Sequence, residues 1–495
     1  MHTRSLIIMV FFSALFIACS DESTQTPLPT PSYIITDAEA FNRFDTDTFS
    51  NSSCLPLALE TPQGIFVSTR GKSSAAGTLE DPLDLQTALS SSSPVQAGET
   101  IWLDQGVYKG NFSSDLRGSE AAPIKVKPLP GKRVVLDGNV KERSSLSISG
   151  TWTEYYALEI VSSSPNHISQ ERGSNPSDLK VNGGVTITGA NTKLINFIAH
   201  DNIGGGISSW SNAPDSEMYG NIIYNNGWSA PDRGHGHAIY AQNKTGYKKI
   251  TNNIIFFGYG TGIHVYTEGG QIEGFDVQKN TWFMTGASDP RSSQKKDNCL
   301  IGGYQPVKRL TMKDNLGYSE NSRGTRIGYG GSVVDQDAVM QNNYLSENFW
   351  IAGSWRELNV SNTTVHRGIR NEANITTSLN NDFTSLPNSG QKVVVSANAY
   401  DPRRARIVIY NFDEALSVAV DLSSVLKVGE AYRIHSVYAL FDDPMLTGIY
   451  GGGTVDIPMG NIAPPQPVGN IGGVDESDDP HKKFGVFIVT HAECQ

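Results

Sequence analysis

Short apolar runs separated by polar turns recur through the middle of the chain, and they predict β-strands. Two of the intervals between these runs are equal, since Ile239 and Ile263 are 24 residues apart, as are Ile327 and Ile351. Strands of three residues cannot bury an apolar face alone, so they need neighbours that repeat the pattern. The repeat predicts a solenoid between about residues 120 and 370. Its aligned strands are Val185-Thr186-Ile187, Gly206-Ile207-Ser208, Ala238-Ile239-Tyr240, Gly262-Ile263-His264, Leu300-Ile301-Gly302, Arg326-Ile327-Gly328 and Trp350-Ile351-Ala352.

Asparagine leads the segments between these strands, for example at Asn221, Asn252-Asn253 and Asn280. Asparagine tolerates left-handed backbone at a corner, and its side chain can form hydrogen-bonded ladders between stacked coils. Longer intervals, such as the one from Ile263 to Ile301, contain extra residues. We expect these residues to leave the coil as loops.

The residues before the repeat have a recognisable order. A strand at 65–68 is followed by a short amphipathic helix at 85–89 and by strands at 98–103 and 106–108. This order resembles the capped start of pectate-lyase-like β-helix proteins, including the chondroitinase-B-like lyases. The resemblance implies an all-β fold, a right-handed parallel β-helix whose open end the helix and strand plug.

The pattern changes after about residue 385. Residues 404–440 alternate strongly, Gly451-Gly452-Gly453 marks a turn, and residues 484–489 form a last apolar run. These features predict a small antiparallel β-sandwich. The expected organisation is a signal peptide at 1–19, a tether and lead-in at 20–58, the β-helix at 59–380 and the sandwich at 385–495.

The N-terminus predicts export. Arg4 precedes an apolar run, Leu6 to Ala18, that is too short for a mature membrane helix and is typical of a signal peptide. Its end resembles a bacterial lipobox, which implies a lipid on Cys19. We expect a monomeric lipoprotein on the cell envelope, held to the membrane by its lipid anchor only; the alternative is a secreted protein. Cys54, Cys299 and Cys494 allow one disulfide, whose pairing stays open.

The composition and charge of the chain limit the kinds of molecule that it can bind. The chain has 49 glycines, only 18% charged residues and a formal net charge of -11. No global basic field exists, so we expect no nucleic-acid partner.

Strand alternation predicts which side chains face outward. If Ile239 and Ile263 point inward, Tyr240 and His264 point to solvent on neighbouring coils. Aromatic rings on such a face can stack on sugars, and a long groove suits a polymer, so the expected partner is a polysaccharide. The expected outward surface is Ser208, Trp210, Tyr240, Gln242, His264, Tyr266, Tyr304 and Arg326.

The densest chemical segment is 228–243, which contains Asp232, Arg233, His235 and His237. His237 is in phase with Ile239, so it either points inward and hydrogen-bonds within the coil or takes part in the site. Zinc-site spacings are missing, so no protein-bound transition metal is expected. The resemblance leaves calcium as a candidate ion, although no Asp cluster lies on the expected face.

The loop 288–297 is locally basic in an acidic chain. Its Arg291 and Lys295, together with Arg233 and Arg326, would bind an anionic ligand such as a uronate or a sulfated glycan. The alternative is a solvated surface loop.

Three functions follow from these features. A polysaccharide lyase would use Arg233 or Arg326 to neutralise the uronate carboxylate. His235 or His264 would be the base, and Tyr240 or Tyr266 would be the acid. The expected catalytic core is Arg233, His235, Tyr240 and His264. A glycoside hydrolase needs two carboxylic acids, for which Asp232 and Glu268 are the available pair. The third function is non-catalytic glycan binding at the surface.

Overall fold

The computed structural model describes residues 60–139, 144–291, 296–320, 322–373, 378–460, 462–469, 474 and 480–492. Cys19, Cys54, Lys295 and Cys494 lie outside these residues. The chain divides into units 1–35 and 36–495, and all that follows concerns the second. No helix within the described residues has the length and apolar composition needed to cross a bilayer.

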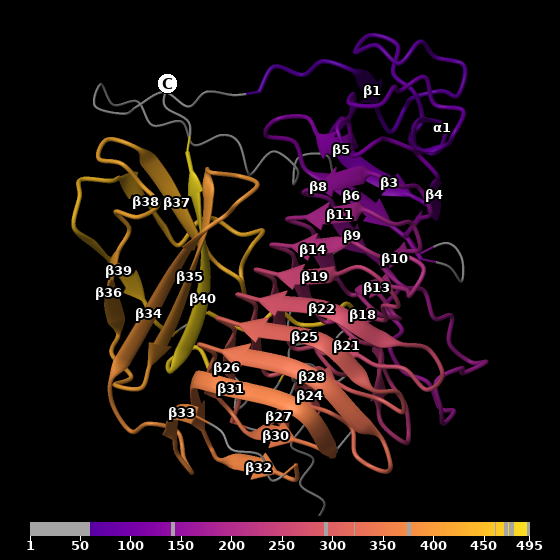
Figure 1. Cartoon of the computed structure of the whole chain (residues 1–495). Coiled ribbons are helices and arrows are strands. Elements are labelled where there is room, and N and C mark those ends of the chain that lie inside the picture. The colour runs from indigo at the N-terminus through magenta and orange to yellow at the C-terminus, as the bar shows by residue number, and fades with distance from the viewer. Residues whose placement is uncertain are drawn as a thin grey trace, which may run out of the picture. The chain divides into compact units, whose positions relative to one another are not determined.

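Three stacks of parallel strands form a β-helix (Figure 1). Most coils contribute one strand to each stack, while the long β31 pairs in both the first stack and the second. The first stack contains β2 (Thr100–Leu103), β5 (Ile124–Pro128), β8 (Thr153–Tyr156), β11 (Thr192–Ile195), β14 (Glu217–Tyr219), β19 (Lys248–Thr251), β22 (Ile272–Gln278), β25 (Val307–Lys313), β28 (Val334–Gln341) and β31 (Ser354–His366). The second contains β3 (Gly106–Lys109), β6 (Val134–Asp137), β9 (Glu159–Val161), β12 (Ile198–His200), β15 (Ile222–Tyr224), β20 (Ile254–Phe256), β23 (Thr281–Phe283), β26 (Leu316–Tyr318) and β29 (Tyr344–Ser346). The third contains β4 (Phe112–Ser114), β7 (Leu146–Ile148), β10 (Val185–Ile187), β13 (Ile207–Ser209), β18 (Ile239–Ala241), β21 (Ile263–Val265), β24 (Asp297–Ile301), β27 (Gly324–Ile327), β30 (Phe349–Ile351) and β32 (Ile369–Asn371).

The N-terminal end of the solenoid is capped as the sequence predicts. Strand β1 (Ile65–Val67) pairs with β2, and helix α1 (Leu85–Leu89) buries Leu85, Ala88 and Leu89 in the core of the solenoid. The Asp84 side chain accepts a hydrogen bond from the backbone N–H of Thr87 at 3.0 Å, which caps the helix. Strand β33 (Ser378–Asp382) pairs with β31 and is the last parallel strand among the described residues.

The inward row of the third stack confirms the predicted facing and corrects the alignment. Ile207, Ile239 and Ile263 pair in register and are fully buried. Ile263 then pairs with Cys299, so the predicted match with Ile301 was two residues out. The predicted alignment of the strand at 185–187 was one residue out, because Val185 rather than Thr186 pairs with Ile207. A shift of two residues leaves each side chain on the same face, so the predicted outward residues keep their side.

Cys299 occupies this interior row as a free, fully buried thiol. Its sulfur therefore takes no part in a disulfide.

A buried asparagine ladder stabilises one corner of the coils, as the sequence predicts. The Asn221 side chain donates to Oδ1 of Asn253 at 2.8 Å, and the Asn253 side chain donates to Asn280 at 3.0 Å. Asn280 and Asn315 continue the ladder, which ends at Asn343. The left-handed residue stands one position before the ladder asparagine: Asn252 has φ 58° and Asp314 has φ 55°. Each coil therefore binds the next through side chains as well as backbone.

The C-terminal residues form the predicted antiparallel sandwich. One sheet has the order β34 (Gln391–Ala397), β35 (Arg404–Asn411), β40 (Phe484–His491), β37 (Ala431–Ser436) and β38 (Leu446–Ile449). The second pairs β36 (Ser417–Asp421) with β39 (Thr454–Pro458). Ile407, Val420, Ile434 and Ile457 pack between the sheets and are fully buried.

This sandwich covers the outer face of the second stack. Tyr224, Phe256 and Phe283 stack on successive coils with ring centroids 5.0 Å apart, and Phe484 of the sandwich stacks on Tyr318 at 4.8 Å. These rings belong to one buried apolar cluster. The second stack is therefore closed to ligands along this ladder.

The outer face of the first stack has alternating charges. Glu154 binds Lys193 at 2.7 Å. Opposite charges on adjacent strands stabilise a solvated sheet and give the face no single sign. In register order the row is Lys125, Glu154, Lys193, Glu217, Lys249 and Asp276.

Candidate functional site

The outer face of the third stack differs from the other two, because aromatic, imidazole and guanidinium groups gather on it. We call it the third-stack face. Its central row, in register, is Ser113, Ser147, Thr186, Ser208, Tyr240, His264, Leu300, Arg326, Trp350 and Arg370.

Two histidines meet at the centre of this face. Nδ1 of His264 lies 3.0 Å from Nε2 of His237, and the ring centroids are 4.2 Å apart. The Tyr240 ring lies 5.6 Å from His264 and 5.8 Å from His237. His237 therefore reaches the outer row, which excludes the inward alternative that its phase with Ile239 left open.

Burial makes both imidazoles weak bases. It lowers the pKa of His237 to about 3 and the pKa of His264 well below 6.5, and His264 also faces His237 and Arg326. Both rings are neutral near pH 7, so the N–H of one donates to the nitrogen lone pair of the other.

Tyr240 has an environment opposite to the one expected from sequence. Burial and the charge of Glu268 raise the pKa of Tyr240, whereas the sequence reasoning expected a nearby cation to lower it. The Gln242 side chain donates to the Tyr240 hydroxyl at 3.0 Å, and the Trp210 ring lies 5.5 Å from the Tyr240 ring. The phenol is therefore protonated at neutral pH.

Aromatic rings extend from the histidines along the face. Tyr266 stacks on His264 at 4.8 Å and meets Tyr329 edge-on at 5.3 Å, and Tyr304 contacts Tyr329 at 5.4 Å. Trp210 is 40% exposed and Tyr304 is 55% exposed, while Tyr266 is half-buried. The ring faces of Trp210 and Tyr304 are available to a ligand, as their predicted phase required.

Arg326 lies deeper than a free surface arginine. Its guanidinium carbon is 3.9 Å from the centre of the Trp350 ring and 4.6 Å from that of Tyr329, and the side chain is 8% exposed. It also donates to the backbone carbonyl of Tyr329. The charge is thus held in place by stacking.

A basic edge borders the face where β24 and β27 begin. Burial, with the charges of Arg233 and Arg323, lowers the pKa of Lys296 from 10.5, while Asp289 opposes the shift. Burial raises the pKa of Asp297 to about 6, although Arg323, Arg326 and Lys296 lie near it. From the sequence, Lys296 and Asp297 were expected in the basic loop 288–297 without a role of their own, and Arg323 was missed. The run Lys295-Lys296-Asp297 was the available signal, but its facing depends on where β24 begins.

The loop before β18 contains two further residues that we expected in the site, Arg233 and His235. It contains the short antiparallel pair β16 (Trp228–Ser229) and β17 (Gly234–His235). His235 is 4% exposed, stacks on Trp228 at 4.8 Å and lies 3.4 Å from Asp232. Burial and the charge of Arg233 lower the pKa of His235. Arg233 pairs with Asp232 at 3.1 Å and remains exposed.

Arg291 holds neighbouring loops together through hydrogen bonds. Its guanidinium donates to the carbonyl of Ser169 at 2.6 Å and to the carbonyl and hydroxyl of Ser229 at 2.5 and 3.0 Å. These hydrogen bonds occupy the guanidinium N–H groups that we expected to bind substrate.

The carboxylates and other metal-ligating side chains of the described residues were the last candidates on this face. No group of three His, Cys, Asp or Glu side chains suited to an ion occurs in the described part of the chain. Asp232 is engaged by His235 and Arg233, and Glu268 is exposed.

The fold and this face define a parallel β-helix protein with a polar, aromatic outer sheet. Residues 65–253 match the family model of the Pel9A-like right-handed beta helix region. This match confirms the resemblance to pectate-lyase-like β-helix proteins and the right-handed solenoid. No curated protein sequence matches the chain.

Solved structures of several kinds are similar to it. Pectate lyase Pel9A is 13% identical, with a TM-score of 0.40 and coverage of 66% of this chain and 78% of the lyase. The GH136 lacto-N-biosidase from Eubacterium ramulus is 12% identical, with a TM-score of 0.40 and coverage of 65% and 68%. PfbA, a surface adhesin of Streptococcus pneumoniae, is 14% identical, with a TM-score of 0.40 and coverage of 58% and 84%.

Proposed function

We propose that this protein acts on an extracellular polysaccharide and cleaves a uronate-containing chain by β-elimination on the third-stack face. The observation that carries the proposal is the placement of a basic edge beside exposed aromatic rings. Trp210 and Tyr304 offer ring faces to sugars, and Lys296 and Arg326 offer positive charge to carboxylates. The family match supports the fold on which this face is built.

The elimination needs three groups. A cation must stabilise the negative charge that develops on the uronate carboxylate, and Arg326 is fixed in place for this role. A base must take the proton from C5 of the uronate. An acid must protonate the glycosidic oxygen as its bond to C4 breaks and the C4–C5 double bond forms.

Lys296 and His264 are the candidate bases. The lowered pKa of Lys296 increases its neutral fraction at a given pH, and His264 is neutral but weak. Tyr240 stays protonated and can donate to the leaving oxygen. His235 and Arg233 lie at the edge of the face, where Arg233 adds positive charge.

A non-catalytic glycan-binding role is the second candidate. The two imidazoles hydrogen-bond to each other, and the exposed rings of Trp210 and Tyr304 need no chemistry to bind sugar. A hydrolase has less support, because Asp232 is engaged and Glu268 is exposed.

The N-terminal sequence adds a location to the proposal. The signal-peptide pattern and Cys19 support an exported, lipid-anchored protein that meets its polymer outside the cell.

A panel of polymers tests the activity. The whole protein would be incubated with pectate, alginate, chondroitin and a neutral glucan, and the ultraviolet absorbance of the unsaturated uronate would be followed. The proposal expects absorbance to rise with at least one acidic polymer and not with the glucan. New reducing ends without absorbance would indicate hydrolysis, and binding without cleavage would indicate the second candidate.

A further inference from the structure

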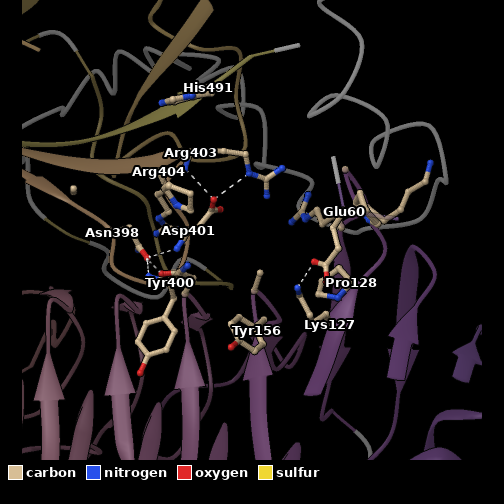
Figure 2. A pocket seen from close by; sticks show the side chains of 18 of the residues that line it. Glu60, Lys127, Pro128, Tyr156, Asn398, Tyr400, Asp401, Arg403, Arg404 and His491 are labelled. Atoms are coloured by element: carbon tan, nitrogen blue, oxygen red, sulfur yellow. Dashed lines mark hydrogen bonds and ion pairs between the residues drawn. The ribbon is translucent and has the colours of Figure 1, made fainter. Parts of the chain in front are cut away.

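A cleft of about 1120 Å³ lies away from the third-stack face, between the first coils of the solenoid and the C-terminal sandwich. Residues 127–134, 156–157 and 159 line one side, and residues 397–398, 400–404 and 423–427 line the other. Figure 2 shows labelled side chains from both sides of the cleft. Its volume is slightly above the usual range of small-molecule sites, about 300–1,000 Å³, so it suits a ligand longer than one sugar.

The walls of this cleft are aromatic and fixed by hydrogen bonds. The Tyr156 and Tyr400 rings meet at 6.4 Å. The Tyr400 hydroxyl donates to Glu217 at 2.6 Å, and the Asn398 side chain donates to Asn196 at 2.7 Å, so the sandwich is tied to the solenoid beside the cleft. The ring walls are therefore preorganised before a ligand arrives.

The charge of the cleft is opposite to that of the chain. Six basic side chains line it against four acidic ones, whereas the whole protein has a net charge of -11. Lys127 pairs with Glu60 at 2.5 Å, and Arg403 pairs with Asp401 at 3.0 Å, as the dashed lines in Figure 2 show. Lys132 and Lys427 have no carboxylate within ion-pair distance among the described residues.

We propose that this cleft binds an acidic oligosaccharide at a site separate from the third-stack face. Ring walls suit sugar faces, and the unpaired ammonium groups of Lys132 and Lys427 suit carboxylates spaced along a chain. The site requires no bond cleavage, so it does not depend on the proposed elimination. Its effect is to hold acidic polymer or its fragments on the protein during repeated encounters with the face.

Binding of defined trisaccharides tests the site. The full chain carrying Trp210→Ala and Tyr304→Ala, which weakens the third-stack face, would be titrated calorimetrically with trigalacturonate, trimannuronate, maltotriose and inorganic phosphate. We expect an acidic trisaccharide to bind and maltotriose not to bind. Adding K132E and K427E should weaken this binding at least about tenfold, a change of about 1.4 kcal/mol.

A matched pair of substitutions controls for net charge. Lys72 and Lys244 are exposed and do not line the cleft, so K72E and K244E should leave the affinity unchanged. Three results would overturn the proposal: no acidic trisaccharide binds, K132E and K427E leave binding intact, or phosphate binds as tightly as the trisaccharides. Polymer cleavage is read separately by ultraviolet absorbance, so failure of the elimination leaves this test unaffected.

Discussion

His264 and His237 share a 3.0 Å hydrogen bond between Nδ1 and Nε2 at the centre of the third-stack face. The two rings come from different coils, because His264 is in β21 and His237 precedes β18. Since the pKa of each ring is lowered, the pair shares one bridging N–H and carries no charge near neutral pH. The face therefore receives positive charge from Arg326 in its central row, from Lys296 and Arg323 at its basic edge, and from Arg233.

The histidine pair should make the fold acid-sensitive. Both pKa values are lower in the folded state than the ordinary 6.5, to about 3 for His237. Below about pH 6.5 the unfolded chain takes up protons that the folded chain does not, so the pair's contribution to stability is complete above that pH and falls as pH falls toward the folded values. Chemical denaturation of wild type and of the H237Q/H264Q variant should show a shallower acid loss in the variant. Parallel curves from about pH 7.5 to about pH 4.5 would contradict this.

Loss of either proton-transfer candidate at the centre should reduce turnover. On the polymer that the panel identifies, Tyr240→Phe should lower kcat by roughly 100-fold or more, the usual size of a proton-transfer contribution, and His264→Ala should do the same if His264 rather than Lys296 is the base. Ser147→Ala is the control, because Ser147 stands on the same outward row three strands away. Near-wild-type rates for both variants, with folding intact, would remove Tyr240 and His264 from the chemistry.

Deprotonation of Lys296 should make kcat/KM rise as the pH increases. The pKa of its ammonium is lowered from 10.5, so the neutral amine accumulates at lower pH than for an ordinary lysine. If Lys296 is the base, kcat/KM rises with pH until the amine is deprotonated, and K296M abolishes that rise. K296R keeps the charge but cannot deprotonate, so it should retain polymer binding and lose turnover. A wild-type pH profile in K296M would assign the base elsewhere.

The asparagine ladder should carry measurable stability. Asn280→Ala removes the acceptor for the Asn253 side chain and backbone and the donor to the Ile250 carbonyl. Each buried group left unpaired costs about 1–3 kcal/mol, so the free energy of unfolding should fall by about 3 kcal/mol or more. Asn359→Ala is the control, because Asn359 is exposed and should change stability by less than about 0.5 kcal/mol. Equal effects of the two substitutions would contradict the ladder's role.

Local sequence patterns were sufficient to predict the solenoid and the facing of its strands. Ile239 and Ile263 fixed the phase, so Tyr240 and His264 were placed correctly on neighbouring outward positions. The alignment slipped between Ile263 and Cys299 because the inserted loop changes the interval and a buried cysteine replaces isoleucine there. The alignment error was two residues, which is one full period of a strand, so Arg326 was still predicted on the correct face.

The electrostatics of the face depend on contacts that a linear pattern does not contain. The shifts at His237 and Tyr240 arise from burial by residues of other coils. The role of Arg291 could not be predicted either, because its partner Ser169 lies more than a hundred positions earlier in the chain. The acidic-oligosaccharide cleft needs the sandwich docked on the first coils, which no local spacing specifies.

The most direct test of the account is the affinity of the third-stack face for acidic polymer. Wild type, a Trp210→Ala/Tyr304→Ala variant and Tyr247→Ala would be compared by affinity electrophoresis in gels containing pectate or alginate, each with K132E and K427E added so that the cleft does not contribute. Tyr247 is the control, because it is 44% exposed and packs against Arg309 beside the first stack. We expect clear retardation of wild type and of Tyr247→Ala, and retardation at least about tenfold weaker for the Trp210→Ala/Tyr304→Ala variant. Equal retardation of all three proteins, or none for wild type, would contradict it.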